Sequence, residues 1–240
     1  MWRGIPAAVA LATVLLGASS AQAVQVSGGA LSADVTADVK PDRLPRRDYA
    51  PVSLIVRGTI DGTDALNAVE LRLDRRLLTA ANTKGLATCK TAQVRSVPLA
   101  QARRRCGKAL IGSGSIGRQF HVPETPVLAF RETVLLFHAA SGRIIVYAYQ
   151  PQVGGPGGFV PAAPVTSGTI KGRSIQLRFL RSAGGVTTSF QFRIGRTWHD
   201  NGRKRSLLLG RCTGQFANQV TLRFGRAALA GTAADTCRGK

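Results

Sequence analysis

Arginine recurs at the same place in several segments that alternate apolar and polar residues. Its guanidinium group is the group in this sequence best suited to bind anions. Four segments alternate apolar and polar residues and carry an arginine at the fourth place: Arg72, Arg178, Arg193 and Arg223. Successive side chains of a strand point to opposite faces, so each arginine would oppose the apolar residues. Guanidinium groups bind phosphate and carboxylate groups bidentately. If the four strands share a sheet, we expect a cationic platform for anionic polymers, the alternative being an ordinary solvated face.

A second basic cluster surrounds Asn201 and Gly202, a dipeptide typical of a two-residue β-hairpin turn. Basic residues beside an exposed aromatic ring would suit a polyanion or a sugar ring. The alternative is a hairpin tip kept soluble by its charge, with the tryptophan folded back on the core. The residues of this candidate polyanion-binding cluster are Arg196, Trp198, Arg203, Lys204 and Arg205.

No catalytic constellation is evident in the sequence. Nucleophilic catalysis needs a serine or cysteine with a base and an orienting acid, and no G-x-S-x-G elbow occurs. Glycoside hydrolysis needs two facing carboxylates, and the only glutamates are Glu70, Glu124 and Glu132. We predict no catalytic residue. The alternative is an extracellular polysaccharide hydrolase that uses these carboxylates or His199.

The sequence contains partial matches to cofactor-binding and metal-binding motifs, but the residues around them do not fit such sites. Residues 112–117 match G-x-G-x-x-G, but a strand pattern and prolines follow where a dinucleotide site needs a helix. The cysteines lack C-x-x-C spacing and have no histidine nearby in the sequence. Asp61, Asp64 and Asn67 are a weak candidate for a calcium site, but this segment is also typical of a hairpin turn. We therefore predict a glycine-rich strand, no cofactor and no metal.

The first 23 residues have the pattern of a secretory signal peptide. Arg3 precedes an apolar run over residues 7–16, and Ala21 and Ala23 form a small-x-small cleavage site. The uncharged stretch of residues 144–170 is interrupted by prolines and glycines, so we expect no transmembrane span after signal removal. The prediction is a protein that is secreted or associated with the cell envelope.

Four cysteines fit an oxidising compartment, where disulfides form. They allow three connectivities, of which we favour the sequence-local pairs Cys89–Cys106 and Cys212–Cys237. Closing loops of these lengths contributes roughly 3 kcal/mol each in the chain-entropy model.

Hydrophobic periodicity of two dominates the rest of the chain and predicts an all-β fold. The expected strands cover residues 52–60, 68–74, 109–122, 133–139, 143–150, 174–180, 186–195, 206–212 and 219–225. One short helix is expected over residues 98–105, with Pro98 in its first turn. We predict a single antiparallel β-sandwich domain over residues 24–240, stapled by disulfides, with a barrel as the alternative. Residues 24–45 are expected to form a loosely ordered lead-in.

Composition restricts the classes of partner. The 240 residues include 33 Lys and Arg against 12 Asp and Glu, a net charge of +21, while 44% hydrophobic residues exclude a disordered basic tail. Export redirects the expected partner from nucleic acid to an anionic cell-wall polymer or polysaccharide. The expected role is therefore a non-catalytic binding or structural protein.

One arrangement of motifs resembles a family of uncharacterised exported proteins of high-GC actinobacteria. Residues 85–89 read G-L-A-T-C, a connecting segment ends at Cys106, and A-L-I-G follows at residues 109–112. The basic hairpin at residues 196–205 and the late cysteine pair are also similar. The resemblance covers most of residues 50–240 and implies export and a β-rich fold, but it brings no activity and no functional residues.

Overall fold

The computed structural model describes residues 22–80, 83–121, 127–151, 162–180, 185–225 and 227–239. Residues 1–21 of the predicted signal peptide lie outside this part, as do Glu124 and residues 152–161. The described residues are mostly β-strand, with two short α-helices, and no helix among them is both long and apolar enough to cross a bilayer. The prediction of an all-β fold is confirmed.

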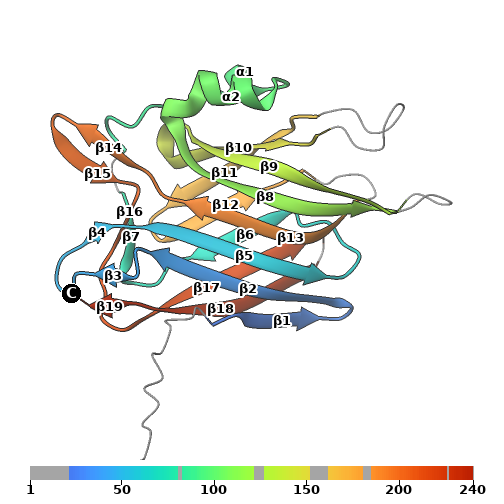
Figure 1. Cartoon of the computed structure of the whole chain (residues 1–240), viewed down its shortest axis with the longest axis horizontal. Helices are drawn as coiled ribbons and strands as arrows, with labels where there is room; N and C mark the ends of the chain where they lie inside the picture. Colours follow the sequence, from blue (N-terminus) through green and yellow to red (C-terminus); the bar gives the residue numbers. More distant parts are fainter. Residues whose placement is uncertain are drawn as a thin grey trace, which may run out of the picture.

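Twelve strands form one continuous sheet, in which every neighbouring pair is antiparallel (Figure 1). Their spatial order is β1 (Val24–Gly28), β2 (Leu31–Lys40), β5 (Ser53–Asp61), β13 (Gly185–Ile194), β8 (Leu110–Phe120), β9 (Leu128–His138), β10 (Arg143–Tyr149), β11 (Val165–Lys171), β12 (Ser174–Arg178), β6 (Ala68–Arg72), β17 (Gln215–Phe224) and β18 (Ala227–Thr236).

The remaining strands form three small sheets beside the main one. They are β14 (Thr197–Asp200) with β15 (Arg203–Ser206), β4 (Ala50–Pro51) with β16 (Leu208–Gly210) and β7 (Leu77–Thr79), and the parallel pair β19 (Arg238–Gly239) with β3 (Arg43–Leu44). The helices are α1 (Thr91–Val94) and α2 (Leu99–Cys106), and short 3₁₀ turns cover Gly107–Ala109 and Ala140–Gly142.

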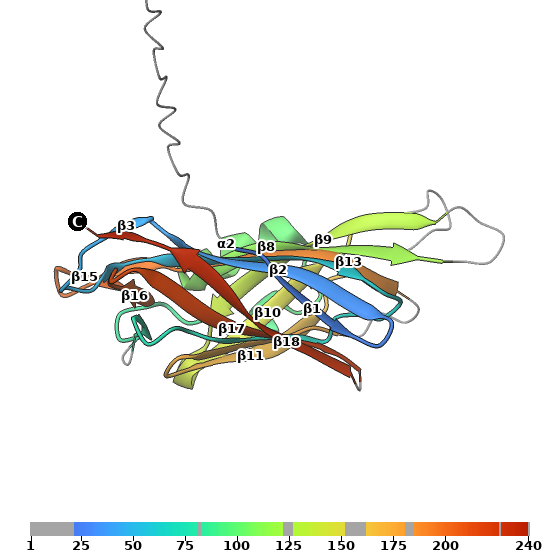
Figure 2. The same cartoon turned by 90° about the horizontal axis from the view of Figure 1, so that it is seen from below.

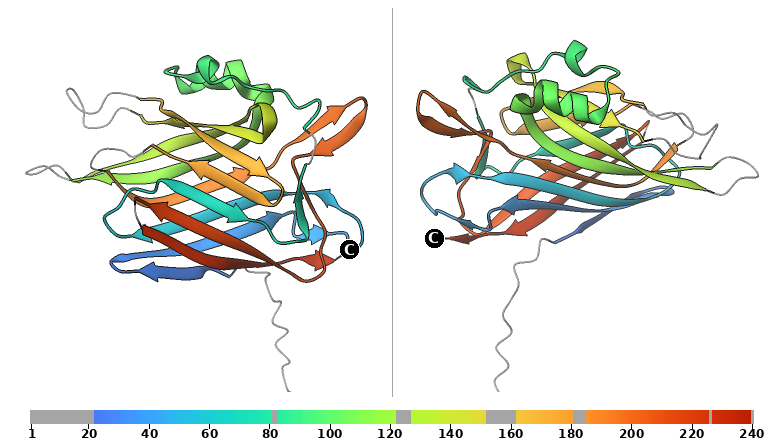
Figure 3. Two further views of the ribbon diagram at one scale, coloured as in Figure 1. Left: turned by 180° about the vertical axis from the view of Figure 1, so that it is seen from behind. Right: turned by 45° about the horizontal axis from the view of Figure 1, so that its top comes forward.

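The main sheet curls until its two edge strands nearly meet, as the views from below and behind show (Figures 2 and 3). The Gln22 amide donates to the Ala234 carbonyl at 2.9 Å, which bridges the segment before β1 to β18. The Val39 amide of β2 donates to Asp235 Oδ2 of β18 at 2.7 Å. Because strand pairing is continuous from β1 to β18, the fold is a nearly closed, barrel-like sheet and not clearly the sandwich that we predicted.

Residues 24–45 are not a loose lead-in, which corrects our expectation. They form β1, β2 and β3, and Val35, Ala37 and Val39 of β2 are at most 1% exposed. These positions alternate with polar residues, so period two was present but was weakened by the small alanine side chains. The curled sheet needs β2, because it joins β1 to β5.

The described residues form two hydrophobic clusters, on opposite faces of the sheet. The larger cluster fills the interior of the curl. The second lies outside, where α1 and α2 cover Leu135 and Phe137 of β9 and Tyr147 of β10. A strand buried on both faces reads as a continuous apolar run, which explains the sequence of residues 134–137. The predicted helix is confirmed as α2.

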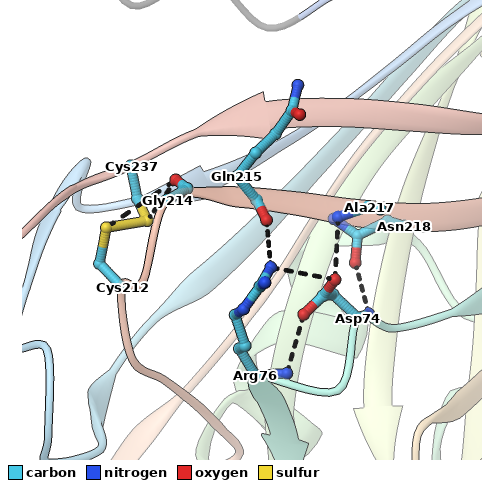
Figure 4. Close-up of polar contacts among 8 residues, drawn as sticks. All are labelled: Asp74, Arg76, Cys212, Gly214, Gln215, Ala217, Asn218 and Cys237. Atoms are coloured by element: carbon cyan, nitrogen blue, oxygen red, sulfur yellow. Dashed lines mark hydrogen bonds and ion pairs between the residues drawn. A yellow bond between two sulfur atoms is a disulfide. The ribbon is translucent and has the colours of Figure 1, made fainter.

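Both predicted disulfides are present. Cys89 and Cys106 join the start of the helical segment to the end of α2, with 5.5 Å between their Cα atoms. Cys212 and Cys237 join the loop before β17 to the end of β18, with 5.7 Å between their Cα atoms (Figure 4). The four cysteines therefore pair locally in sequence, as predicted.

Candidate functional site

Three of the four strand arginines lie on one outer face of the sheet, formed by β12, β6 and β17. Arg178 and Arg223 both pair with Ala68 of the central strand, which places them in one row across the three strands. Arg72 lies in a parallel row, between Ser174 of β12 and Gln219 of β17. The side chains between these positions, such as Leu71, are buried in the interior. Period two therefore assigned these arginines to the solvent face correctly.

Arg193 lies on the opposite wall of the curled sheet. It pairs with Ile55 of β5 and Ser113 of β8, and its side chain is exposed. The four arginine strands do share one sheet, but the sheet curls between β13 and β12. The expectation of one shared platform is therefore wrong for Arg193.

A compact group of cations forms where β6 ends beside the turn between β11 and β12. We call Arg72, Lys171 and Arg173 the cationic corner. With Ser174 they line a shallow depression of about 380 Å³. All three side chains are exposed, and none forms an ion pair with another described residue. Their charges are therefore available to an anionic ligand.

Hydrogen bonds hold the backbone of the cationic corner in place. The Leu73 amide donates to the Arg173 carbonyl at 2.8 Å, and the Thr79 hydroxyl donates to the Gly172 carbonyl. Gly172 has a φ of +57°, which suits glycine in the turn between β11 and β12. The corner is therefore part of the rigid sheet.

The segment after Arg72 is tied to β17 by a carboxylate network (Figure 4). Asp74 accepts from the Arg76 amide at 2.9 Å and from the Ala217 amide at 3.1 Å. Its own amide donates to Asn218 Oδ1 at 3.1 Å. Arg76 Nη1 lies 3.6 Å from the Asp74 carboxylate, so the charge of Arg76 is compensated and does not add to the free cations of the corner.

Glu70 interrupts the positive face between the two rows of arginines. The Arg223 guanidinium donates to both carboxylate oxygens, Nε to Oε1 at 2.7 Å and Nη2 to Oε2 at 3.1 Å. Gln176 Nε2 donates to Oε1 at 2.8 Å. The hydrogen bond from Arg223 is the main reason that the pKa of Glu70 lies below its usual value. Arg223 is therefore paired, whereas Arg178 acts on Glu70 through its charge and forms no ion pair among the described residues.

The basic hairpin at residues 196–205 forms as predicted, but its tryptophan is not exposed. Trp198 is 8% exposed, and its indole Nε1 donates to the Lys84 carbonyl at 2.9 Å. Arg205 Nε lies 2.8 Å from Asp200 Oδ2. Alternation along β14 turns Trp198 and Asp200 inward, and leaves Thr197 and His199 exposed beside the basic side chains. The cluster is corrected to three exposed cations, namely Arg196, Arg203 and Lys204.

The described residues of the hydrolase alternative, namely Glu70, Glu132 and His199, do not come together. Glu70 lies on the outer face of β6, whereas Glu132 of β9 is buried inside the curl. His199 is exposed on the hairpin and pairs with Lys204 across the strands. Among the described residues, these side chains therefore form no facing pair of carboxylates and no acid–base pair.

Sequence reasoning missed a cavity at one end of the curled sheet, with a volume of about 740 Å³, which is also lined by residues 96–98 between the two helices. Arg118 of β8 and Glu132 of β9 line it and form an ion pair, with 2.9 Å between Arg118 Nε and Glu132 Oε1. Their side chains are 2% and 5% exposed. The signal was present in the sequence, because Arg118 has the same parity as the apolar Ile116 and Phe120, which predicts an inward charge.

Comparison of the chain with family models, with curated proteins and with solved structures found no match in any of the three.

Proposed function

We propose that this protein is a non-catalytic binding protein of the cell envelope that attaches to an anionic polymer through the cationic corner. The single observation that carries the proposal is the set of three exposed cations, Arg72, Lys171 and Arg173, held on rigid backbone with no ion-pair partner among the described residues. The net charge of +21 adds long-range attraction for polyanions.

The spacing of the cations fits a chain that carries repeated negative charges. Lys171 and Arg72 lie in the same cross-strand row, one on each side of Ser174. Neighbouring strands are about 4.8 Å apart, so these two residues are separated by roughly 10 Å across the sheet. Arg178, two rows along, extends the positive face. A polymer with phosphate or carboxylate groups can therefore contact several cations at once.

Export is part of the proposal. The signal-like pattern of residues 1–23 and the family resemblance both favour a secreted or envelope-associated protein. Two disulfides are compatible with an oxidising compartment. In that setting the relevant anionic polymers are wall polymers and acidic polysaccharides.

Affinity chromatography in rising salt tests the proposal. The purified protein is applied to immobilised polyphosphate and, separately, to immobilised polygalacturonate, which distinguishes phosphate from carboxylate recognition. The test variant combines Arg72→Gln, Lys171→Gln and Arg173→Gln. The control variant combines Arg103→Gln, Arg104→Gln and Lys108→Gln, which removes the same charge from exposed positions at and after α2.

We expect the corner variant to elute at clearly lower salt than the control variant. Polyanion binding releases counterions, so the slope of log K against log salt should fall by about 2 when three cations are removed. Equal elution of the two variants would show that net charge alone governs binding and would refute a specific site at the corner.

A further inference from the structure

The cavity of about 740 Å³ lies at the end of the sheet where β8, β10 and β12 finish and where β9 and β11 begin. Its volume is within the range of small-molecule sites, roughly 300–1,000 Å³. Most of its lining is apolar and includes Val97, Pro164, Phe179 and Leu180. Phe179 is fixed by a stacked contact with Phe192, with 5.4 Å between the ring centroids. The cavity is therefore a preformed apolar chamber.

The Arg118–Glu132 pair is the charged feature of this chamber, whose lining also includes the polar residues Ser96, Gln150 and Thr166. Arg118 is also 3.4 Å from the Thr187 hydroxyl, through Nη1, and Thr187 is itself fully buried. A buried ion pair gives little net stability, because the loss of hydration offsets the attraction between the charges. Stability of the fold is therefore a weak explanation for two charged residues at this position. They instead offer a ligand one fixed donor and one fixed acceptor.

The charges of Arg118 and Glu132 cancel, which restricts the class of ligand. An ionised ligand group would add a third charge beside two charged side chains that are only 2% and 5% exposed, which is unfavourable without a partner. A hydroxyl or amide group can donate to the Glu132 carboxylate and accept from the Arg118 guanidinium without adding charge. The ligand that fits is therefore neutral at its polar end.

The mouth of the cavity favours an apolar body on the same ligand. Leu180 is 52% exposed at the rim, and it is one of two large hydrophobic residues so exposed in the described part of the chain. The other, Val127, is 48% exposed and does not line the cavity. A ligand that covers Leu180 would remove apolar surface from water.

We propose that this cavity binds a neutral amphipathic small molecule, an alcohol or amide with an apolar chain. Its polar end lies at Arg118 and Glu132, and its chain passes Phe179 and Leu180. The inference is independent of the polyanion surface, because the cavity and the depression at the cationic corner share no lining residue.

Displacement of the neutral fluorescent probe N-phenyl-1-naphthylamine tests the ligand class. The competitors are 1-decanol, decanoate and decyltrimethylammonium, which share a ten-carbon chain and differ in charge. We expect 1-decanol to displace the probe at concentrations at least tenfold lower than either charged analogue. Equal displacement by all three, tighter binding of decanoate to this cationic protein, or absence of probe binding would each overturn the proposal.

Substitutions at the rim test the location of the site. Leu180→Glu should weaken binding of 1-decanol at least tenfold, whereas Val127→Glu is the matched control and should leave it unchanged. Ala163→Trp, which places a large ring at the cavity wall, provides a second test and should also abolish probe binding. Circular dichroism verifies that each variant is folded. Unchanged binding in folded Leu180→Glu and Ala163→Trp variants would place the ligand elsewhere and refute the assignment.

Discussion

Breaking the Arg118–Glu132 ion pair should destabilise the protein far more than replacing both partners together. Glu132→Leu removes the carboxylate that lies 2.9 Å from the guanidinium, at a site where the Arg118 side chain is 2% exposed. Arg118→Met leaves the carboxylate of Glu132, 5% exposed, without its cation. Removal of one partner of a buried pair costs about 3–5 kcal/mol. Because the pair lines a cavity, water can hydrate the remaining charge in part, and we expect values near 3 kcal/mol.

The double variant Arg118→Met, Glu132→Leu removes both charges and keeps side chains of similar volume. Apolar replacement of a whole buried ion pair is often neutral or stabilising. We therefore expect the free energy of unfolding of the double variant to lie within about 1 kcal/mol of the unmodified protein. The double-mutant cycle should then give a coupling energy of several kcal/mol between the two residues.

A second pair of the same geometry provides the matched control. Arg57 of β5 lies directly opposite Thr36 of β2, and its partner Asp38 is two residues beyond Thr36. The interior pair has the same offset between its arginine and its acid. The Arg57 side chain is 46% exposed on the outer face, so water can solvate its guanidinium group when the carboxylate is removed. A cycle of Arg57→Gln and Asp38→Asn should therefore give a coupling energy of about 1 kcal/mol or less.

Urea unfolding followed by far-ultraviolet circular dichroism measures all the variants, with the disulfides kept intact. Losses below 1 kcal/mol for both single variants of the interior pair would mean that water solvates these charges. Simple additivity of the two losses in the double variant would mean that the residues do not act as a unit. Either result would refute the reasoning, and it would also weaken the case for a fixed polar end in the cavity.

Two further predictions concern the closure and the packing of the sheet. Burial raises the pKa of Asp235, so the native state binds the proton more tightly than the unfolded state, and stability should fall as pH rises from about 3.8 through the native pKa. Asp235→Asn keeps an acceptor for the Val39 amide and removes the charge. In thermal melts the variant should have a higher melting temperature than the unmodified protein at pH 7, and nearly the same melting temperature below pH 3.8. A lower melting temperature at pH 7 would contradict this prediction. Gly114→Ala should cost about 1–3 kcal/mol in urea unfolding, because a Cβ atom there would lie 2.0 Å from the Gln191 carbonyl oxygen. Gly107→Ala, where nothing lies within 4 Å, is the control, and an equal loss in both variants would contradict the steric cause.

The local structure of this chain could be predicted because period two and turn residues are local signals. The hairpin at Asn201 and Gly202, the helix that ends at Cys106 and the local disulfide pairs all depend on residues close together in the sequence. The glycine-rich segment is a strand, as predicted, because Gly112 and Gly114 allow close approach of β13 to β8. Such features need no knowledge of the strand order.

The global arrangement could not be predicted, because it depends on which strands are neighbours. Arg193 and Arg178 have the same local pattern, yet β13 and β12 lie on opposite walls of the curled sheet. For Trp198 the sequence left an exposed and an inward position open, because it does not show that the Lys84 carbonyl lies nearby to accept its hydrogen bond. A sequence pattern therefore predicts the face on which a side chain lies, whereas the strand order decides its neighbours.

The same distinction separates the two candidate sites. Charged residues on the face opposite the apolar residues of a strand, such as Arg72, point to solvent and are mostly hydrated. Binding of an anionic polymer there is favoured by the release of counterions. Charged residues on the same face as the apolar residues, such as Arg118 and Glu132, point to the interior, where the two charges compensate each other. The cationic corner and the neutral, polar-ended cavity share no lining residue, and we propose that they bind ligands of different chemistry. A substitution in either site can therefore test that site without altering the other.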